Sequence, residues 1–184
     1  MDMTKDLLHG GALDQMRAMF PEANEPWIDL STGINPWPYP VAGIPEATFR
    51  HLPTHAAYEA CRAAAAIAFD APHRNVLIAP GSELLIRLLP QIITPQRVTV
   101  LSPTYGDHAR TWRSAGCDVI ETDAPLSMAD TADVIVVCNP NNPDGRCFDP
   151  LTLLATADRL AARGGWLIVD CSPSATVRQI GQIA

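Results

Sequence analysis

The sequence predicts an α/β fold, with three layers (α/β/α) around a mostly parallel sheet. Short apolar runs of strand length alternate with longer segments of helical pattern, which is typical of parallel strands joined by crossover helices. Several runs are continuously apolar, as expected for strands buried on both faces. A chain of 184 residues, 47% of them hydrophobic, is long enough for one buried core.

The N-terminal quarter differs from the rest. Residues 1–45 are irregular and rich in proline, tryptophan and glycine, with at most one short strand, at residues 27–30. We expect this segment to form an arm. An alanine-rich helix is predicted over residues 54–69, and "NVLIAPGSELLIRLLPQII" then predicts a short strand, a Gly-Ser turn and an apolar helix.

The strand-turn-helix pattern recurs twice more. "RVTVLSPTYGDHARTWRSAG" predicts a strand and a helix, and a short strand follows around "CDVIETD". "DVIVVCNPNNPDG" predicts a buried strand that ends in stiff turn residues, before the helix "PLTLLATADRLAARG" and the strand "GWLIVD". Ligands of parallel sheets bind beyond the carboxyl ends of the strands. We therefore expect a ligand-binding domain over residues 46–170 and a tail of different character over residues 171–184.

Composition and charge exclude several classes of function. The formal net charge is -7 and no block of lysine and arginine appears, so nucleic acid is not expected as a partner. The N-terminus lacks the pattern of a signal peptide, and no apolar run reaches membrane-spanning length, so we expect a cytoplasmic protein without a membrane partner. The five cysteines are scattered without a C-x-x-C pair, which favours neither disulfides nor a metal site.

Polar groups follow four of the predicted strands: "PGSEL", "SPTYGDH", "CNPNNPDG" and Asp170. Each alone has an ordinary interpretation, because such turns are usually polar and Ser82 would serve as a helix cap. However, "GSE" at the start of a helix offers free backbone N–H groups and the positive end of the helix dipole, which suit a phosphate. G-x-G-x-x-G and P-loop patterns are absent, which favours a phosphate on some other cofactor.

These pieces, with "HGG" and "IDLSTGINP" before them, resemble the fold-type-I pyridoxal-phosphate enzymes from about His9 to Asp170. Within that family the chain is most similar to the threonine-phosphate decarboxylases of cobalamin biosynthesis, relatives of the histidinol-phosphate aminotransferases. The resemblance implies the large domain of that fold, pyridoxal 5′-phosphate as cofactor, and decarboxylation of a small phosphorylated amino acid, L-threonine O-3-phosphate. It also implies a homodimer for the complete enzyme.

The resemblance further implies roles for particular residues. Tyr105 would stack over the pyridine ring, Asn142 would bind its phenolic oxygen, and Asp170 would pair with its protonated nitrogen; the alternative for Asp170 is an ordinary loop or capping residue. The cofactor phosphate would be seated by Gly81, Ser82 and Glu83. The substrate would be reached by His9, Gly10, Gly11 and Asn35, for which a turn and an Asn-Pro bend are the alternative.

The chain also departs from the family. A Schiff-base lysine is expected well beyond Asp170, whereas the only lysine here is Lys5 and the sequence continues as "CSPSATVRQIGQIA". We therefore expect a truncated form, with an incomplete sheet, that holds no catalytic lysine and is inactive by itself. Two alternatives stay open: a histidinol-phosphate-like aminotransferase, and a non-catalytic ligand-binding or interaction module on the same fold.

Overall fold

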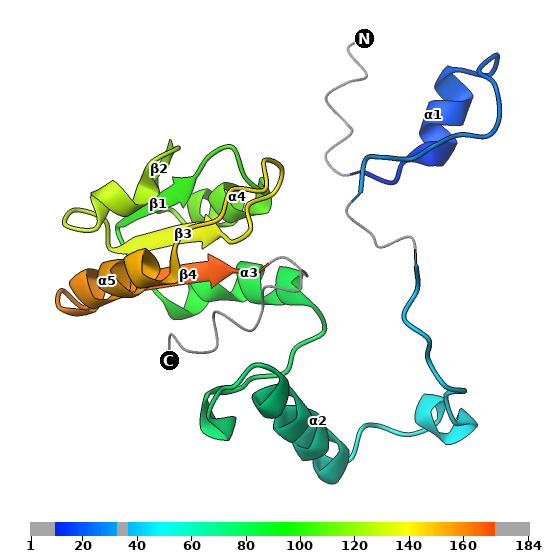
Figure 1. Cartoon of the computed structure of the whole chain (residues 1–184), viewed down its shortest axis with the longest axis horizontal. Coiled ribbons are helices and arrows are strands. Elements are labelled where there is room, and N and C mark those ends of the chain that lie inside the picture. The colour runs from blue at the N-terminus through cyan, green and yellow to red at the C-terminus, as the bar shows by residue number, and fades with distance from the viewer. Residues whose placement is uncertain (1–9, 33–36, 172–184) are drawn as a thin grey trace. The chain divides into compact units, whose positions relative to one another are not determined.

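The computed structural model describes residues 10–32 and 37–171. The chain divides into two compact units, Met1–His51 and Leu52–Ala184, and each is described by itself. The first contains α1 (Leu13–Met19) and a short 3-10 helix, η2 (Glu46–Phe49). The second contains the sheet and its helices (Figure 1).

The strand expected at residues 27–30 does not form, and that prediction is wrong. In this segment, side-chain carboxylates accept hydrogen bonds from backbone N–H groups that would otherwise donate to a neighbouring strand. The Glu25 carboxylate accepts from the Trp27 N–H at 3.0 Å, and the Asp29 carboxylate accepts from the Ser31 N–H at 2.8 Å. Such local hydrogen bonds compete with strand pairing and favour turns.

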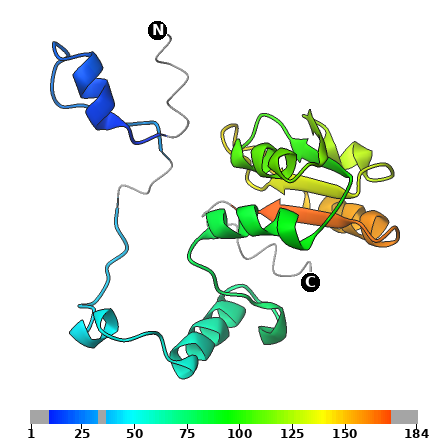
Figure 2. The same cartoon turned by 180° about the vertical axis from the view of Figure 1, so that it is seen from behind.

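The second unit is built on a four-stranded parallel sheet in the order β2-β1-β3-β4 (Figures 1 and 2). The strands are β1 (Arg97–Leu101), β2 (Asp118–Thr122), β3 (Val134–Cys138) and β4 (Trp166–Asp170). β1, β3 and β4 lie where apolar runs predicted them, and β2 lies where a short strand was predicted around "CDVIETD". The parallel α/β architecture is therefore confirmed.

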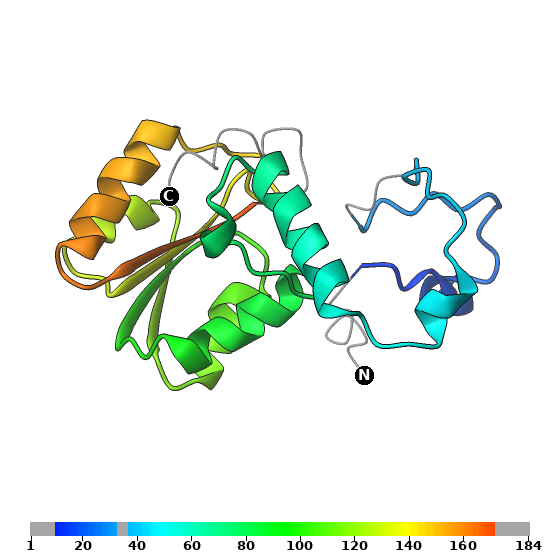
Figure 3. The same ribbon diagram turned by 90° about the horizontal axis from the view of Figure 1, so that it is seen from below.

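Helices cover both faces of the sheet (Figure 3). On one face lie α3 (Ser82–Ile92) and α4 (Asp107–Ser114); on the other lie α5 (Pro150–Ala161) and the short η4 (Pro125–Met128). Every residue of β3 is buried, which explains its continuously apolar sequence.

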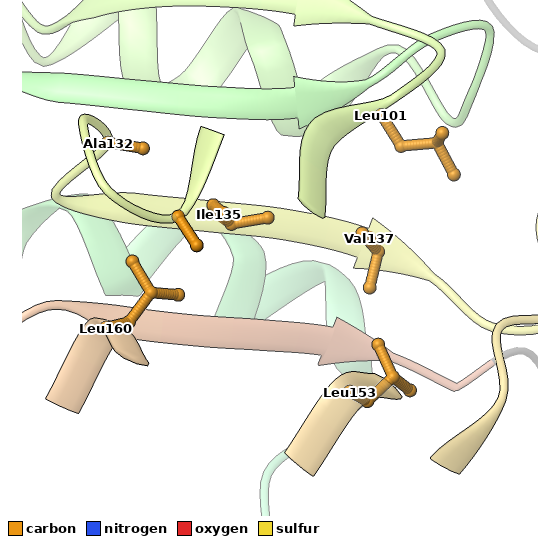
Figure 4. Packing of buried hydrophobic residues seen from close by; sticks show 7 residues of the cluster. Leu101, Ala132, Ile135, Val137, Leu153 and Leu160 are labelled. Atoms are coloured by element: carbon orange, nitrogen blue, oxygen red, sulfur yellow. The ribbon is translucent and has the colours of Figure 1, made fainter. Parts of the chain in front are cut away.

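Successive residues of β3 point to opposite faces of the sheet. Ile135 and Val137 pack with Leu153 and Leu160 of α5 (Figure 4). Val134 and Val136 pack on the other side, in the cluster that contains Trp112 of α4. A fully buried leucine or valine contributes about 1.5–3 kcal/mol relative to an exposed one, so these two clusters fix the strand ends that carry the polar groups.

The predicted helices form, and side chains cap the N-termini of α2 (His55–Ala68) and α5. α2 begins after Thr54, whose hydroxyl accepts from the Ala57 N–H at 3.1 Å. The strand expected at residues 76–79, however, is absent, and that prediction is wrong. Among the residues that the structure describes, this segment pairs with no strand, and the Arg62 guanidinium takes the Val76 carbonyl at 3.1 Å.

Candidate active site

A cavity of about 240 Å³ opens at the carboxyl ends of β3 and β4. Five of the six residues predicted to bind a cofactor line it, and the sixth, Gly81, directly precedes one of them. The lining residues are Ser82, Glu83, Ile86, Tyr105, Cys138, Asn142, Asp170 and Cys171. The structure thus brings together groups that are up to 89 positions apart in sequence (82 to 171).

The start of α3 forms one wall of this cavity. Gly81 precedes the helix with φ +91°, a left-handed conformation that glycine adopts without strain. No side chain caps the helix, so its first backbone N–H groups keep their capacity to bind an anion. The N-terminus of α3 therefore has N–H groups that suit an anion, and the phosphate role expected of Gly81, Ser82 and Glu83 stays a prediction.

Tyr105 closes the cavity beside α3. Its hydroxyl donates to the Glu83 carboxylate at 3.0 Å, and Arg87 donates to the same carboxylate at 2.7 Å. Burial, aided by the hydrogen bond to Glu83, raises the pKa of Tyr105 to about 12. The Tyr105 hydroxyl is therefore neutral and a donor at physiological pH. Its ring also lies edge-on to His108, with the ring centres 6.0 Å apart.

The two neighbouring asparagines of the "NPNNPDG" turn have different environments. Asn141 is buried, and its side chain accepts from the Thr104 hydroxyl at 2.7 Å and donates to the Pro103 carbonyl at 3.0 Å and the Asp144 carboxylate at 2.8 Å. Asn142 is exposed and lines the cavity. The turn is thus fixed through Asn141, and Asn142 is presented to a ligand.

Asp170 ends β4 and contacts a histidine that sequence reasoning missed. His108, the second residue of α4, lies with its Nε2 3.0 Å from the Asp170 carboxylate, and the Cys138 thiol is 3.5 Å from the same nitrogen. Burial lowers the pKa of His108, but the hydrogen bonds to Asp170 and Cys138 outweigh it and raise the pKa to about 9. At neutral pH the imidazolium therefore holds a positive charge against the Asp170 carboxylate.

The predicted substrate residues lie in the other unit. Gly11 donates its backbone N–H to the Ser31 hydroxyl at 2.8 Å, and a side chain on Gly10 would collide with the Ser31 carbonyl oxygen at 1.9 Å. Gly10 and Gly11 therefore pack closely on Ser31. His9, Asn35 and Lys5 lie outside the described residues, and the roles predicted for the glycines stay predictions.

Residues 25–179 match the model of the family described as aminotransferase class I and II. The chain belongs to that family. A threonine-phosphate decarboxylase from Pseudomonas aeruginosa is 42% identical over 178 residues, which are 93% of this chain and 53% of that protein. A histidinol-phosphate aminotransferase from Mesorhizobium japonicum is 29% identical over 85% of this chain and 46% of its own length.

Among solved structures, an L-threonine-O-3-phosphate decarboxylase from Porphyromonas gingivalis matches with a TM-score of 0.53 and 19% identity, over 61% of this chain and 35% of that one. This match supports the fold. The chain spans about half the length of the curated relatives it matches. Among the described residues, no helix is both long and apolar enough to cross a membrane.

The hydrogen-bonding and charged groups of this cavity suit pyridoxal 5′-phosphate, which carries a phosphate at one end and a ring nitrogen at the other. The N–H groups at the start of α3 suit a phosphate, the Asn142 amide suits a ring hydroxyl or phenolate, and the Asp170 carboxylate suits a protonated ring nitrogen. A negative group at Asp170 and a positive helix end at Ser82 match the two charged ends of such a molecule.

Proposed function

We propose that this chain is the cofactor-binding part of a pyridoxal-phosphate-dependent enzyme that decarboxylates L-threonine O-3-phosphate in cobalamin biosynthesis. The observation that carries the proposal is the strand-end cavity, where a helix N-terminus, an amide and a carboxylate converge. Residues 46–170 would be the partial cofactor-binding domain, and residues 1–45 the arm near the substrate. We also propose a homodimer for the complete enzyme, and the cytoplasm stays the predicted compartment.

In this proposal each residue at the cavity has a defined role toward the cofactor. Gly81, Ser82 and Glu83 bind the phosphate through backbone N–H groups, Tyr105 stacks on the ring, and Asn142 donates to the phenolic oxygen. Asp170 holds the proton on the ring nitrogen, and His108 positions the Asp170 carboxylate by donating to it at 3.0 Å. The bound cofactor supplies an electron sink for the electrons that the departing CO₂ leaves behind.

The choice of reaction rests on the relatives. The Pseudomonas aeruginosa protein named threonine-phosphate decarboxylase shares 42% identity with this chain, against 29% for the Mesorhizobium japonicum histidinol-phosphate aminotransferase. Both would use the same cofactor groups, so the cavity alone does not separate them. Decarboxylation is therefore the first proposal and transamination the second.

The missing lysine makes a clear test of cofactor binding. Lys5, the only lysine of the sequence, belongs to none of the groups predicted to bind the cofactor, and an amine must be held close to the aldehyde to react efficiently. We therefore expect this chain to bind pyridoxal phosphate weakly and reversibly, with inorganic phosphate competing. Absorbance titration would measure the binding, and borohydride treatment should leave no stoichiometric adduct at one site. A single full adduct on Lys5, found by mass spectrometry, would contradict this.

A test of the reaction itself needs a protein that also carries the Schiff-base lysine expected beyond Asp170. Residues 1–170 fused to the C-terminal half of the Pseudomonas aeruginosa relative should release CO₂ from L-threonine O-3-phosphate. Transfer of the amino group to a 2-oxo acid without release of CO₂ would favour the aminotransferase. A well-folded fusion that binds the cofactor and does neither would favour a non-catalytic module.

A further inference from the structure

Three metal-binding side chains meet at the carboxyl ends of β3 and β4. They are His108 from α4, Cys138 at the end of β3 and Asp170 at the end of β4, and their ligand atoms all lie within 4.8 Å of one another. His108 and Cys138 are 2% and 1% exposed, so packing holds them in place. Cys138 and Asp170 also line the cavity, which leaves an approach from solvent.

The spacing of these atoms is close to that of a tetrahedral zinc site. Zinc–ligand bonds of about 2.0–2.3 Å at tetrahedral angles put the ligand atoms roughly 3.4–3.6 Å apart. The separations here are 3.0 Å from His108 Nε2 to Asp170 Oδ2, 3.5 Å from Cys138 Sγ to His108 Nε2, and 3.8 Å from Cys138 Sγ to Asp170 Oδ2. A shift of a few tenths of an ångström, about 0.4 Å at most in any one separation, would bring all three to those values.

We propose that His108, Cys138 and Asp170 form a binding site for a thiophilic divalent cation such as Zn²⁺. One thiolate, one imidazole nitrogen and one carboxylate oxygen supply three ligands, and a water molecule from the cavity completes the tetrahedron. The sulfur ligand selects Zn²⁺ over Mg²⁺ and Ca²⁺, which prefer oxygen. On binding, the Cys138 thiol and His108 Nε2 each give their proton to the solvent, and the metal takes their place.

The site has a consequence for the proposed cofactor. The same Asp170 carboxylate would hold either the metal or the ring nitrogen, so the two ligands exclude each other. This exclusion rests on the proposed function, whereas metal binding rests only on the three side chains. Zinc would then act as an inhibitor that competes with pyridoxal phosphate.

Cobalt is the probe for the site, because Co²⁺ bound to a thiolate absorbs in the near ultraviolet and the visible range. The 184-residue chain, reduced with a phosphine and freed of metal, should take up one equivalent of Co²⁺, and Zn²⁺ should displace it because Zn²⁺ binds more tightly than Co²⁺. Cys138→Ser should abolish the thiolate band. Cys147→Ser, which removes an exposed cysteine outside the cluster, should retain it. Absence of the band from the wild-type chain, or its persistence in Cys138→Ser, would overturn the proposal.

Two further measurements guard the result. If Cys138→Ser does not fold, X-ray absorption of the zinc-loaded wild-type chain should show one sulfur at about 2.3 Å and lighter atoms at about 2.0 Å. A shell of nitrogen and oxygen alone would refute the site. Pyridoxal phosphate should bind at least tenfold more weakly to the zinc-loaded chain. Equal binding, with the cobalt band present, would keep the metal site and refute the placement of the cofactor at Asp170.

Discussion

Asn141→Ala should destabilise the fold far more than the same change at its neighbour. The Asn141 side chain is 4% exposed and makes three hydrogen bonds, to Thr104, Pro103 and Asp144. Pro103 and Asp144 are exposed, so water replaces part of what they lose. At about 0.5–1.5 kcal/mol for each net hydrogen bond, the loss in free energy of unfolding comes to about 2–3 kcal/mol.

Urea unfolding of the chain, followed by circular dichroism in the presence of a reductant and a chelator, measures this loss. Asn142→Ala is the matched control, because Asn142 is exposed and its loss should change stability by less than about 0.5 kcal/mol. In the cofactor-binding assay, Asn142→Ala should bind pyridoxal phosphate several-fold more weakly than the wild type, although its stability is unchanged. Equal destabilisation by the two substitutions would refute the division of roles between the two asparagines.

Three other expectations follow from the same structure. Leu153→Ala, at a fully buried position of α5, should lower the free energy of unfolding by about 2–5 kcal/mol, whereas Leu151→Ala at an exposed position of the same helix should change it little. The pKa of about 9 at His108 lies above its ordinary value of 6.5. The contribution of protonated His108 to the free energy of unfolding should therefore be complete below pH 6.5 and lost as the pH rises through 9. Between pH 6 and 9, the free energy of unfolding of the chelator-treated wild type, measured by urea titration, should therefore fall by about 3 kcal/mol more than that of His108→Gln. Parallel pH dependences of the two proteins would contradict this. Gly81→Ala should cost about 1–2 kcal/mol at φ +91° and weaken phosphate binding, as calorimetry would detect.

Much of the sheet was predictable because hydrophobic burial is a local signal. β1, β3 and β4 are short apolar runs between turn residues, and each forms where its pattern indicates. The segments at residues 27–30 and 76–79 carry similar patterns but form no strand. A strand also requires a partner for its N–H groups, and the sequence of one segment says nothing about its partner.

The position of the candidate site was predictable for a different reason. In a parallel sheet the carboxyl ends of all strands meet at one edge, so Asn142 and Asp170 had to lie near each other once the strands were known. The division between Asn141 and Asn142 was not predictable, because it depends on which side chain turns inward. His108 was missed because it lies at the start of a helix, seven residues after the end of β1, and only the packing of α4 against β1 and β3 brings it to Asp170.

The cysteines show where reasoning from spacing stops. The absence of a C-x-x-C pair argued against a metal site, but that test finds only ligands that are close in sequence. His108, Cys138 and Asp170 are separated by 30 and 32 positions, and each belongs to a helix or strand that the core holds in place. A buried cysteine that ends a central strand is a different kind of signal, because the strand end places its thiol at the same edge of the sheet as Asn142 and Asp170. The cobalt titration tests this inference directly, since Cys138 and Cys147 differ in position and not in chemistry.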